Sequence, residues 1–288
     1  MNFKIYLAKQ GYRKSTVFGH LQDLRRFENW CKDQDINPTK ASYENLLKFI
    51  QFKQKASVSK STINNHLNSI HKYFDYLIKS NERKDNPAKD LRLKNRGKTI
   101  YKQLLMPDQL EDLYMSFQQR QEWEYKGECT KKTHRRNCVV LGLLVYQGVQ
   151  TSELSLLEKG QLNLLQGSVY IPSSAKGNSR ILKLNASQIL PIQNYLQDLP
   201  KEQEKLFVNG KLSNCVTWIM KTLRKSIEKE DLNAQHIRAS VIMNWLKLYN
   251  IRQVQYMTGH KQISTTERYK EQDIGDLQKQ LEQFHPFR

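Results

Sequence analysis

The segment "MTGHKQISTTERYKEQD", residues 257–273, holds the side chains best suited to chemistry on an anion. Ser264 and Glu267 have the S-x-x-E spacing of a helix capping box, in which each side chain bonds the other residue's backbone N–H. Tyr269 is therefore predicted to lie early in a short helix, between two basic residues. Such a phenol is either an ordinary surface aromatic or a nucleophile prepared to attack a phosphate.

The charge of the chain favours a polyanionic partner. Lys and Arg number 47 against 28 Asp and Glu, which gives a net charge of +19 and a pI near 9.7. Nucleic acid is the first candidate and an anionic membrane surface the second. The longest apolar run, residues 139–146, is too short to cross a bilayer, and the N-terminus lacks the features of a secretory signal. Four scattered cysteines without a C-x-x-C pair are typical of a reducing cytoplasm, so we expect a cytoplasmic protein without zinc.

The first ninety residues predict helices only, and these helices would form a small bundle. One helix, over residues 15–31, has Ser15 as its predicted N-cap, and a second covers residues 42–52. The third helix, over residues 61–78, has the clearest apolar stripe: Ile63, Leu67, Ile70, Phe74 and Leu77. Its other face carries polar side chains suited to a phosphate backbone or to plain solvent: Asn64, Asn65, Asn68 and Lys72.

A basic segment separates this bundle from a mixed α/β region. Residues 89–102 hold six basic residues against one Asp, which indicates a cationic interdomain strap or, equally, a solvated linker. Beyond residue 103 the pattern predicts helices at 107–117 and 130–148, and later at about 213–229, 237–249 and 251–257. Two strand segments, 167–174 and 179–185, are joined through "AKGN", which places Lys176 at the tip of a hairpin.

Four segments together resemble a known family. Residues 237–273 resemble the C-terminal block of the tyrosine recombinases, the family of Xer, Cre and phage integrases, which reads His-x-x-Arg, a helix, Leu-Gly-His, a Ser-Thr-Thr stretch and the nucleophilic Tyr. The segment "YQGVQTSELSLL" resembles the family's Gly-Leu-Arg-x-Ser-Glu-Leu box, and "AKGNSRILKL" resembles its Lys-bearing hairpin. The N-terminal bundle is similar to the family's core-binding domain. The resemblance therefore covers nearly the whole chain in the right order.

The resemblance implies a mainly α fold with two domains. Residues 1–88 would form a helical, SAM-like core-binding domain, residues 89–102 a basic linker, and residues 103–288 a mixed α+β catalytic domain with a small β-hairpin sheet. The two domains would clamp double-stranded DNA that carries inverted repeats, as a homodimer on one site and a tetramer in synapsis. The C-terminal tail would pack on a neighbouring protomer, although its apolar spacing equally allows packing on its own domain.

The resemblance also assigns roles. Tyr269 would attack a DNA phosphodiester to give a 3′-phosphotyrosine and a free 5′-hydroxyl, and strand exchange would follow without metal, nucleotide or other cofactor. Arg238 would hold the phosphate as a bidentate fork, His260 would donate to a non-bridging oxygen, and Lys176 would protonate the leaving oxygen. Arg180 and Lys183 are rivals for the role of Lys176. The expected function is site-specific DNA recombination or integration, as in a mobile element.

Two positions depart from the family pattern. Gln150 stands where the first arginine belongs, and Gln235 stands where the histidine of His-x-x-Arg belongs, with His236 one position later. All three remain candidate phosphate contacts, but glutamine supplies no charge, and losing one charge-assisted contact costs on the order of 3 kcal/mol. Either a nearby cation substitutes, for which the candidates are Lys131, Arg135 and Arg136, or the site is slow, or it is inactive.

Two alternatives to a recombinase stay open. One is a degenerate, recombinase-like protein that binds DNA without cleaving it, as the two glutamines suggest. The other is a basic helical protein that binds RNA or a membrane surface.

Overall fold

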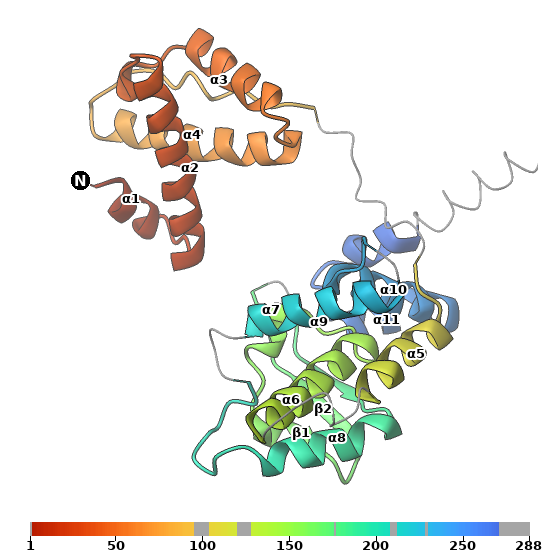
Figure 1. The fold of residues 1–288 in the computed structure, drawn as a ribbon. Coiled ribbons are helices and arrows are strands. Elements are labelled where there is room, and N and C mark those ends of the chain that lie inside the picture. The colour runs from red at the N-terminus through yellow and green to blue at the C-terminus, as the bar shows by residue number, and fades with distance from the viewer. Residues whose placement is uncertain are drawn as a thin grey trace, which may run out of the picture. The chain divides into compact units, whose positions relative to one another are not determined.

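The computed structural model describes residues 2–94, 104–119, 128–175, 177–207, 212–227 and 230–270. The chain divides into two compact units, Met1–Thr99 and Ile100–Arg288. Both are mainly helical, as the sequence predicts, and the second contains a small three-stranded sheet, one strand more than the predicted hairpin (Figure 1). None of the helices within these residues is long and apolar enough to cross a membrane.

Unit 1 is a helical bundle. Its elements are α1 (Phe3–Lys9), α2 (Lys14–Asp33), the short 3-10 helix η1 (Pro38–Lys40), α3 (Tyr43–Lys55) and α4 (Lys60–Lys79). Ser42 and Ser59 cap α3 and α4 by accepting backbone N–H bonds. Helices α2 and α4 pack against each other (Figure 1), and the whole predicted stripe of α4 is buried.

Two details of unit 1 differ from the prediction. Helix α2 begins at Lys14 after the N-cap Arg13, so Ser15 lies inside the first turn and does not cap it. Helix α1 was not predicted, because its seven residues are too few for a periodic pattern. It is held by aromatic packing, since the Phe3 ring lies 5.5 Å from Tyr73 and 5.6 Å from Tyr76 between centroids.

The start of the basic segment packs along α4. The Asn64 side chain pairs with Leu93 as a neighbouring strand would: Nδ2 donates to the Leu93 carbonyl at 2.9 Å and Oδ1 accepts from its N–H at 2.9 Å. Leu91 and Leu93 pack on a small apolar cluster that includes Leu67, while Arg92 between them is exposed. Asn64 therefore faces neither phosphate nor plain solvent, and residues 91–93 belong structurally to unit 1.

Unit 2 is built around one central helix. Its labelled helices are α5 (Pro107–Gln118), α6 (Glu128–Val145), α7 (Thr151–Leu154), the 3-10 helix η3 (Lys159–Gln161), α8 (Ala186–Gln197), α9 (Leu212–Ile227), α10 (Ala234–Leu248) and α11 (Ile251–Thr258). A further helical stretch begins at residue 263. Helix α6 contacts α5, α8, α9 and α10, and its last eight residues are all buried. Figure 1 shows α5 and α8 running beside α6.

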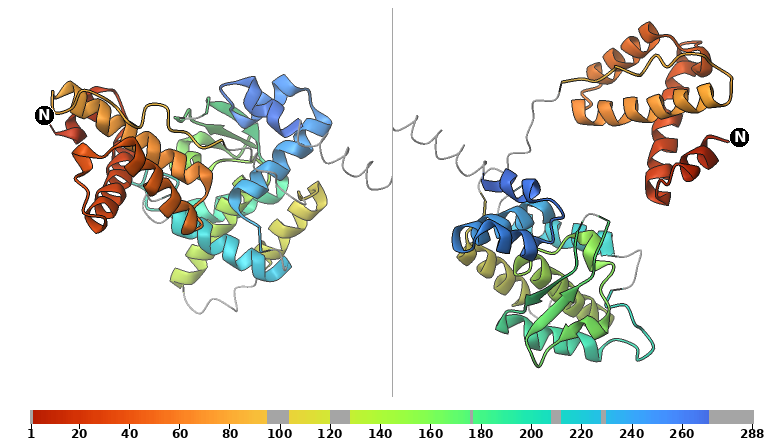
Figure 2. Two further views of the ribbon diagram at one scale, coloured as in Figure 1. Left: turned by 90° about the horizontal axis from the view of Figure 1, so that it is seen from above. Right: turned by 180° about the vertical axis from the view of Figure 1, so that it is seen from behind.

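The sheet is an antiparallel meander of β1 (Leu162–Asn163), β2 (Ser168–Ile171) and β3 (Arg180–Lys183), in that order. Figure 2 shows it from behind in the right-hand view. Val169 pairs with Leu182, and both face the core, whereas the neighbouring pair Tyr170 and Ile181 is exposed. The predicted hairpin is confirmed, and its register directs Arg180 inward.

The pairing of Asn64 with Leu93 predicts a local weakness in unit 1. Asn64→Ala removes two hydrogen bonds worth about 1 kcal/mol each, so residues 91–93 should open more often from α4. We expect trypsin to cut after Arg92 on the order of ten times faster, because proteolysis follows the population of the open form. Asn68→Ala, on an exposed position of the same helix, is the control and should leave the rate unchanged. Equal rates for the two variants would contradict the prediction.

Candidate active site

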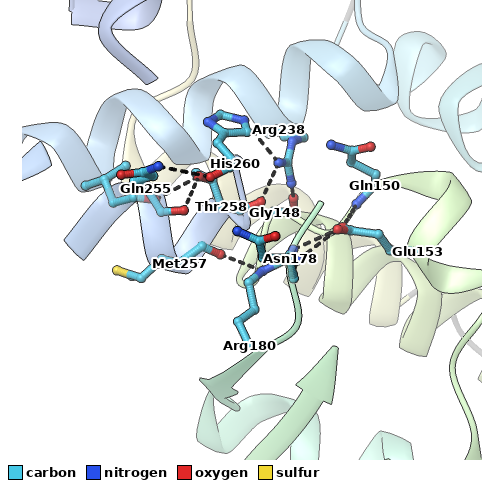
Figure 3. Close-up of polar contacts among 11 residues, drawn as sticks. Gly148, Gln150, Glu153, Asn178, Arg180, Arg238, Gln255, Met257, Thr258 and His260 are labelled. Atoms are coloured by element: carbon cyan, nitrogen blue, oxygen red, sulfur yellow. Dashed lines mark hydrogen bonds and ion pairs between the residues drawn. The ribbon is translucent and has the colours of Figure 1, made fainter. Parts of the chain in front are cut away.

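Arg238 lies in α10, one turn after the N-cap Asn233, and only 7% of it is exposed. Its Nη1 donates to the Gly148 carbonyl, and its Nη2 donates to the Thr258 carbonyl at 2.8 Å and to His260 Nε2 at 3.4 Å (Figure 3). Burial is the main cause that lowers the pKa of Arg238, yet an arginine stays charged in proteins. Arg238 is thus a buried cation and not the surface arginine of a helix start.

Two glycine turns bring the partners of Arg238 to it. Gly148 follows α6 with φ 54°, and Gly259 ends α11 with φ 73°, a left-handed conformation that side-chain-bearing residues rarely adopt. The second turn reverses the chain directly before His260, so that a residue far along the sequence meets α10. The glycine of the Gly-His pair is therefore explained by the structure, because glycine readily adopts the φ that this turn requires.

His260 is held in one tautomer. Because a guanidinium only donates, His260 Nε2 accepts from Arg238, so Nδ1 carries the proton and donates to Thr266 Oγ1 at 2.9 Å. Burial first, and then the charges of Arg238 and Arg180, lower the pKa of His260 to about 4. The imidazole is therefore neutral at pH 7.

Tyr269 meets His260 ring to ring. The two ring centroids lie 6.1 Å apart with an interplanar angle of 12°, and Tyr269 is half-buried. A phenolate at this position would raise the pKa of Arg238, which shows that the phenol lies within electrostatic reach of the guanidinium. The helix that carries Tyr269 begins at residue 263, so Ser264 lies inside its first turn and not at the predicted N-cap position.

A fully buried ion pair lies beneath these residues. Arg180 Nη1 and Nη2 donate to the two carboxylate oxygens of Glu153 at 2.8 and 3.0 Å, and both side chains are 0% exposed. Burial raises the pKa of Glu153, but the hydrogen bonds and the charge of Arg180 outweigh burial and hold it below its usual range. Arg180 is therefore a structural cation. Because its side chain is fully buried, it cannot reach DNA, and this excludes it as a rival for the role of Lys176.

Lys176 itself lies outside the described residues, but the backbone on both sides of it is anchored. The Ala175 carbonyl accepts from Lys261 Nζ at 3.3 Å, and Gly177 forms a β-bridge with His260. The Asn178 N–H donates to the Gly259 carbonyl at 2.8 Å. The loop between β2 and β3 therefore lies against the turn that carries His260.

The residues at the positions that depart from the family pattern differ in how far they are exposed to solvent. Gln150 is the N-cap of α7 and half-buried, and its backbone N–H donates to Glu153 at 2.9 Å. Figure 3 shows its side chain on the side of Arg238 that is away from His260, with no contact drawn to either residue. Gln235 is exposed, whereas His236 is 2% exposed and so is not accessible to a phosphate.

The cationic candidates in α6 have other partners or lie far along the helix from Gln150. Arg135 pairs with Asp198 at 3.0 Å and Arg136 donates to Asn137 at 3.0 Å. From Arg136 to the end of α6 at Val145 the helix rises about 14 Å, and Lys131 lies further still. The contacts of these three residues therefore give no support to the idea that one of them replaces the charge absent at Gln150.

The sequence singled out Tyr269, His260 and Arg238, and the structure brings these three together. The contact of Thr266 with His260 and the pairing of Glu153 with Arg180 were not predicted, although Arg180 alone was a candidate for the role of Lys176. Glu153, the acidic residue of the Ser-Glu-Leu segment, was the signal that could have indicated this ion pair, because a buried charge requires a partner.

The neutral state of His260 predicts a pH dependence. Its pKa lies near 4 in the folded protein and near 6.5 in the unfolded chain, so it favours folding above pH 6.5 and this contribution is lost as the pH falls toward 4. Between pH 7 and 4.5 the wild type should lose roughly 2 to 3 kcal/mol more stability than His260→Gln. Urea unfolding at both pH values measures this difference. Equal losses would show that His260 titrates normally.

Two family models together match most of this chain. Residues 103–274 match the phage integrase family, and residues 1–81 match the N-terminal SAM-like domain of phage integrases. The TnP I resolvase of Bacillus thuringiensis is 24% identical over 97% of this chain and 97% of its own. The tyrosine recombinase XerD of Oceanobacillus iheyensis is 25% identical over 99% of this chain and 96% of its own.

Solved structures show the same fold. XerH recombinase bound to difH substrate aligns with a TM-score of 0.67 at 19% identity, over 88% of this chain and 76% of that one. A lambda integrase dimer bound to a core site aligns with a TM-score of 0.68 at 11% identity, over 93% and 74%. Since the family match covers more than half of the chain, this protein belongs to the phage integrase family, that of the tyrosine recombinases.

Proposed function

We propose that this protein is a site-specific DNA recombinase in which Tyr269 attacks a DNA phosphodiester. The observation that carries the proposal is the meeting of Tyr269, His260 and Arg238, in which the phenol stacks on a neutral imidazole that a buried guanidinium contacts. A nucleophile next to a desolvated cation is the arrangement that phosphoryl transfer without metal requires.

Arg238 is the residue proposed to bind the phosphate. Its contacts to Gly148, Thr258 and His260 occupy one N–H of Nη1 and both of Nη2. Among the described residues its Nε–H and the second Nη1–H have no partner, and these are the donors that remain for phosphate oxygens. Because the two carbonyls fix the guanidinium, little reorganisation is needed when charge develops on the phosphate.

His260 and Lys176 are proposed as the donors to the non-bridging and the leaving oxygens of the phosphate. In the DNA-free protein His260 Nε2 accepts from Arg238, so donation to a non-bridging oxygen requires the ring to exchange its proton when phosphate enters. Lys176 is proposed to protonate the leaving 5′-oxygen. The anchoring of Ala175 and Gly177 beside His260 supports this role.

The proposed reaction is balanced and reversible. The Tyr269 hydroxyl gives up its proton to solvent as its oxygen forms a bond to phosphorus, the bond from phosphorus to the 5′-oxygen breaks, and that oxygen takes a proton from Lys176. The resulting 3′-phosphotyrosine conserves the phosphodiester, so a 5′-hydroxyl of a second strand can reverse the step without ATP.

Duplex DNA is the proposed partner, bound by a homodimer on inverted repeats and by a tetramer in synapsis. The solved XerH and lambda integrase structures contain their DNA sites, the latter with a dimer. The net charge of +19 supports salt-sensitive binding to the phosphate backbone.

A second candidate function is DNA binding without cleavage. It is favoured by one observation: Gln150 lies beside Arg238 but brings no charge, and Arg135 and Arg136 are engaged elsewhere. Gln235 likewise brings no charge to the place of the family's histidine.

Tyr269→Phe tests the cleavage proposal. On a suicide substrate nicked near the cut, wild type should form a covalent protein–DNA adduct, and the variant should form none because it lacks the attacking oxygen. Denaturing electrophoresis detects the adduct. Tyr249→Phe, which alters an exposed tyrosine, is the control and should keep the adduct. A wild type that forms no adduct with its own site would leave only the binding function.

Gln150→Arg tests whether the missing charge limits the rate. A cation beside Arg238 should raise the rate of strand cleavage on the order of tenfold to a hundredfold, because a charge-assisted contact to the transition state is worth about 3 kcal/mol. Single-turnover cleavage at saturating protein measures this effect. Gln166→Arg adds the same charge at an exposed turn and should leave the cleavage rate unchanged. Identical rates for wild type and Gln150→Arg would contradict the prediction.

A further inference from the structure

The ion pair between Glu153 and Arg180 joins three separate segments of the active site. Glu153 lies in α7 and also accepts from the backbone N–H of Gln150 at 2.9 Å. Arg180 begins β3, directly after the loop that holds Lys176. Its Nε donates to the carbonyl of Met257 in α11 at 2.8 Å (Figure 3). One pair of side chains therefore contacts the turn at Gln150, the hairpin and the approach to His260.

The backbone is packed directly on this pair, at two glycines next to proposed catalytic residues. A Cβ added at Gly177 would lie 2.8 Å from a carboxylate oxygen of Glu153. A Cβ added at Gly259 would lie 2.5 Å from Nη1 of Arg180 and 3.0 Å from the Asn178 carbonyl. The chain thus approaches each charged group more closely than any other residue type allows at these positions.

Arg180 cannot act on DNA itself. Its side chain is 0% exposed, and the carboxylate of Glu153 compensates its charge. Its effect on the reaction must therefore be transmitted through the segments that it holds.

We propose that the Glu153–Arg180 pair is a positioning element that sets Ala175 and Gly177, the two neighbours of Lys176 in the chain, in register with the Gly259–His260 turn. The inference rests on the proposed function, in which Lys176 protonates the leaving 5′-oxygen. The bonds from Asn178 to Gly259 and from Gly177 to His260 complete this register. A lysine at position 180 keeps the charge but cannot donate to both carboxylate oxygens and to Met257 in one plane, because it lacks the guanidinium fork.

The test separates protonation of the leaving group from the other steps. Cleavage is compared on ordinary DNA and on DNA whose scissile 5′-oxygen is replaced by sulfur. In the sulfur substrate the phosphorus–sulfur bond breaks and a thiolate leaves without a proton, since thiols have pKa values of about 8.5. A defect in proton donation is therefore rescued by sulfur, whereas a defect in folding, DNA binding or attack is not.

Arg180→Lys should lose at least tenfold in cleavage rate on ordinary DNA and recover most of that loss on the sulfur substrate. Lys176→Ala should show the same pattern, and duplex binding by both variants should stay within about twofold of wild type. Arg135→Lys, the same change in the ion pair with Asp198, is the control and should cleave both substrates like wild type.

A second variant protects the test against misfolding. Glu153→Met with Arg180→Met replaces the pair by apolar side chains of similar length, a change that buried ion pairs often tolerate. It should fold, which thermal unfolding checks, and show the same rescue by sulfur as Arg180→Lys.

The outcomes distinguish this proposal from the proposed function. Equal losses on both substrates for Arg180→Lys, or no loss on ordinary DNA, would overturn the positioning role while Lys176→Ala is still rescued. If sulfur fails to rescue Lys176→Ala, the assignment of Lys176 as the acid is wrong, and the positioning proposal is overturned with it.

Discussion

Unit 2 depends on two oppositely charged side chains that are fully buried and hydrogen-bonded to each other. Glu153 and Arg180 are both removed from water, and they bond each other, the backbone of Gln150 and Asn178 near them in the chain, and Met257 in α11. A buried pair with this many contacts contributes more to geometry than to net stability, because desolvation offsets much of the attraction between the charges. What the pair determines is the relative position of α7, β3 and the end of α11.

Arg238, at the site itself, is likewise a buried charge that is held by neighbouring polar groups. Two backbone carbonyls, of Gly148 and Thr258, hold the guanidinium without neutralising it, so its full positive charge remains for an incoming anion. The carboxylate of Glu153 is instead engaged by Arg180 and lies behind the site. His260 stays neutral beside these cations because burial and their charges both disfavour its protonated form. The positive field of the site therefore rests on few groups, and the neutrality of Gln150 matters correspondingly more.

In unit 1 a polar side chain forms the hydrogen bonds that a neighbouring strand would otherwise give to the backbone. Asn64 gives residue Leu93 the two hydrogen bonds that a neighbouring strand would give, and apolar residues on either side of Arg92 cover α4. The basic segment is thereby ordered at its start, with its cationic side chain directed to solvent. Its later residues, from 95 to 102, lie outside the described part of the chain.

The sequence alone determined the two-domain, mainly helical architecture, because periodic apolar spacing such as Ile63, Leu67 and Ile70 records which face is buried. It also determined which types of residue were available for the chemistry, since Tyr269, His260 and Arg238 lie in one C-terminal block. Helix starts were less accurate, as Ser15 and Ser264 show, because several adjacent residues can cap a helix equally well.

Only the tertiary structure decided how the distant segments meet. No local pattern reveals that Arg180 pairs with Glu153 across 27 residues, or that Arg135 pairs with Asp198 across 63 residues. Local sequence reports propensity and periodicity, whereas the partner of a buried charge is set by the packing of the whole unit around it.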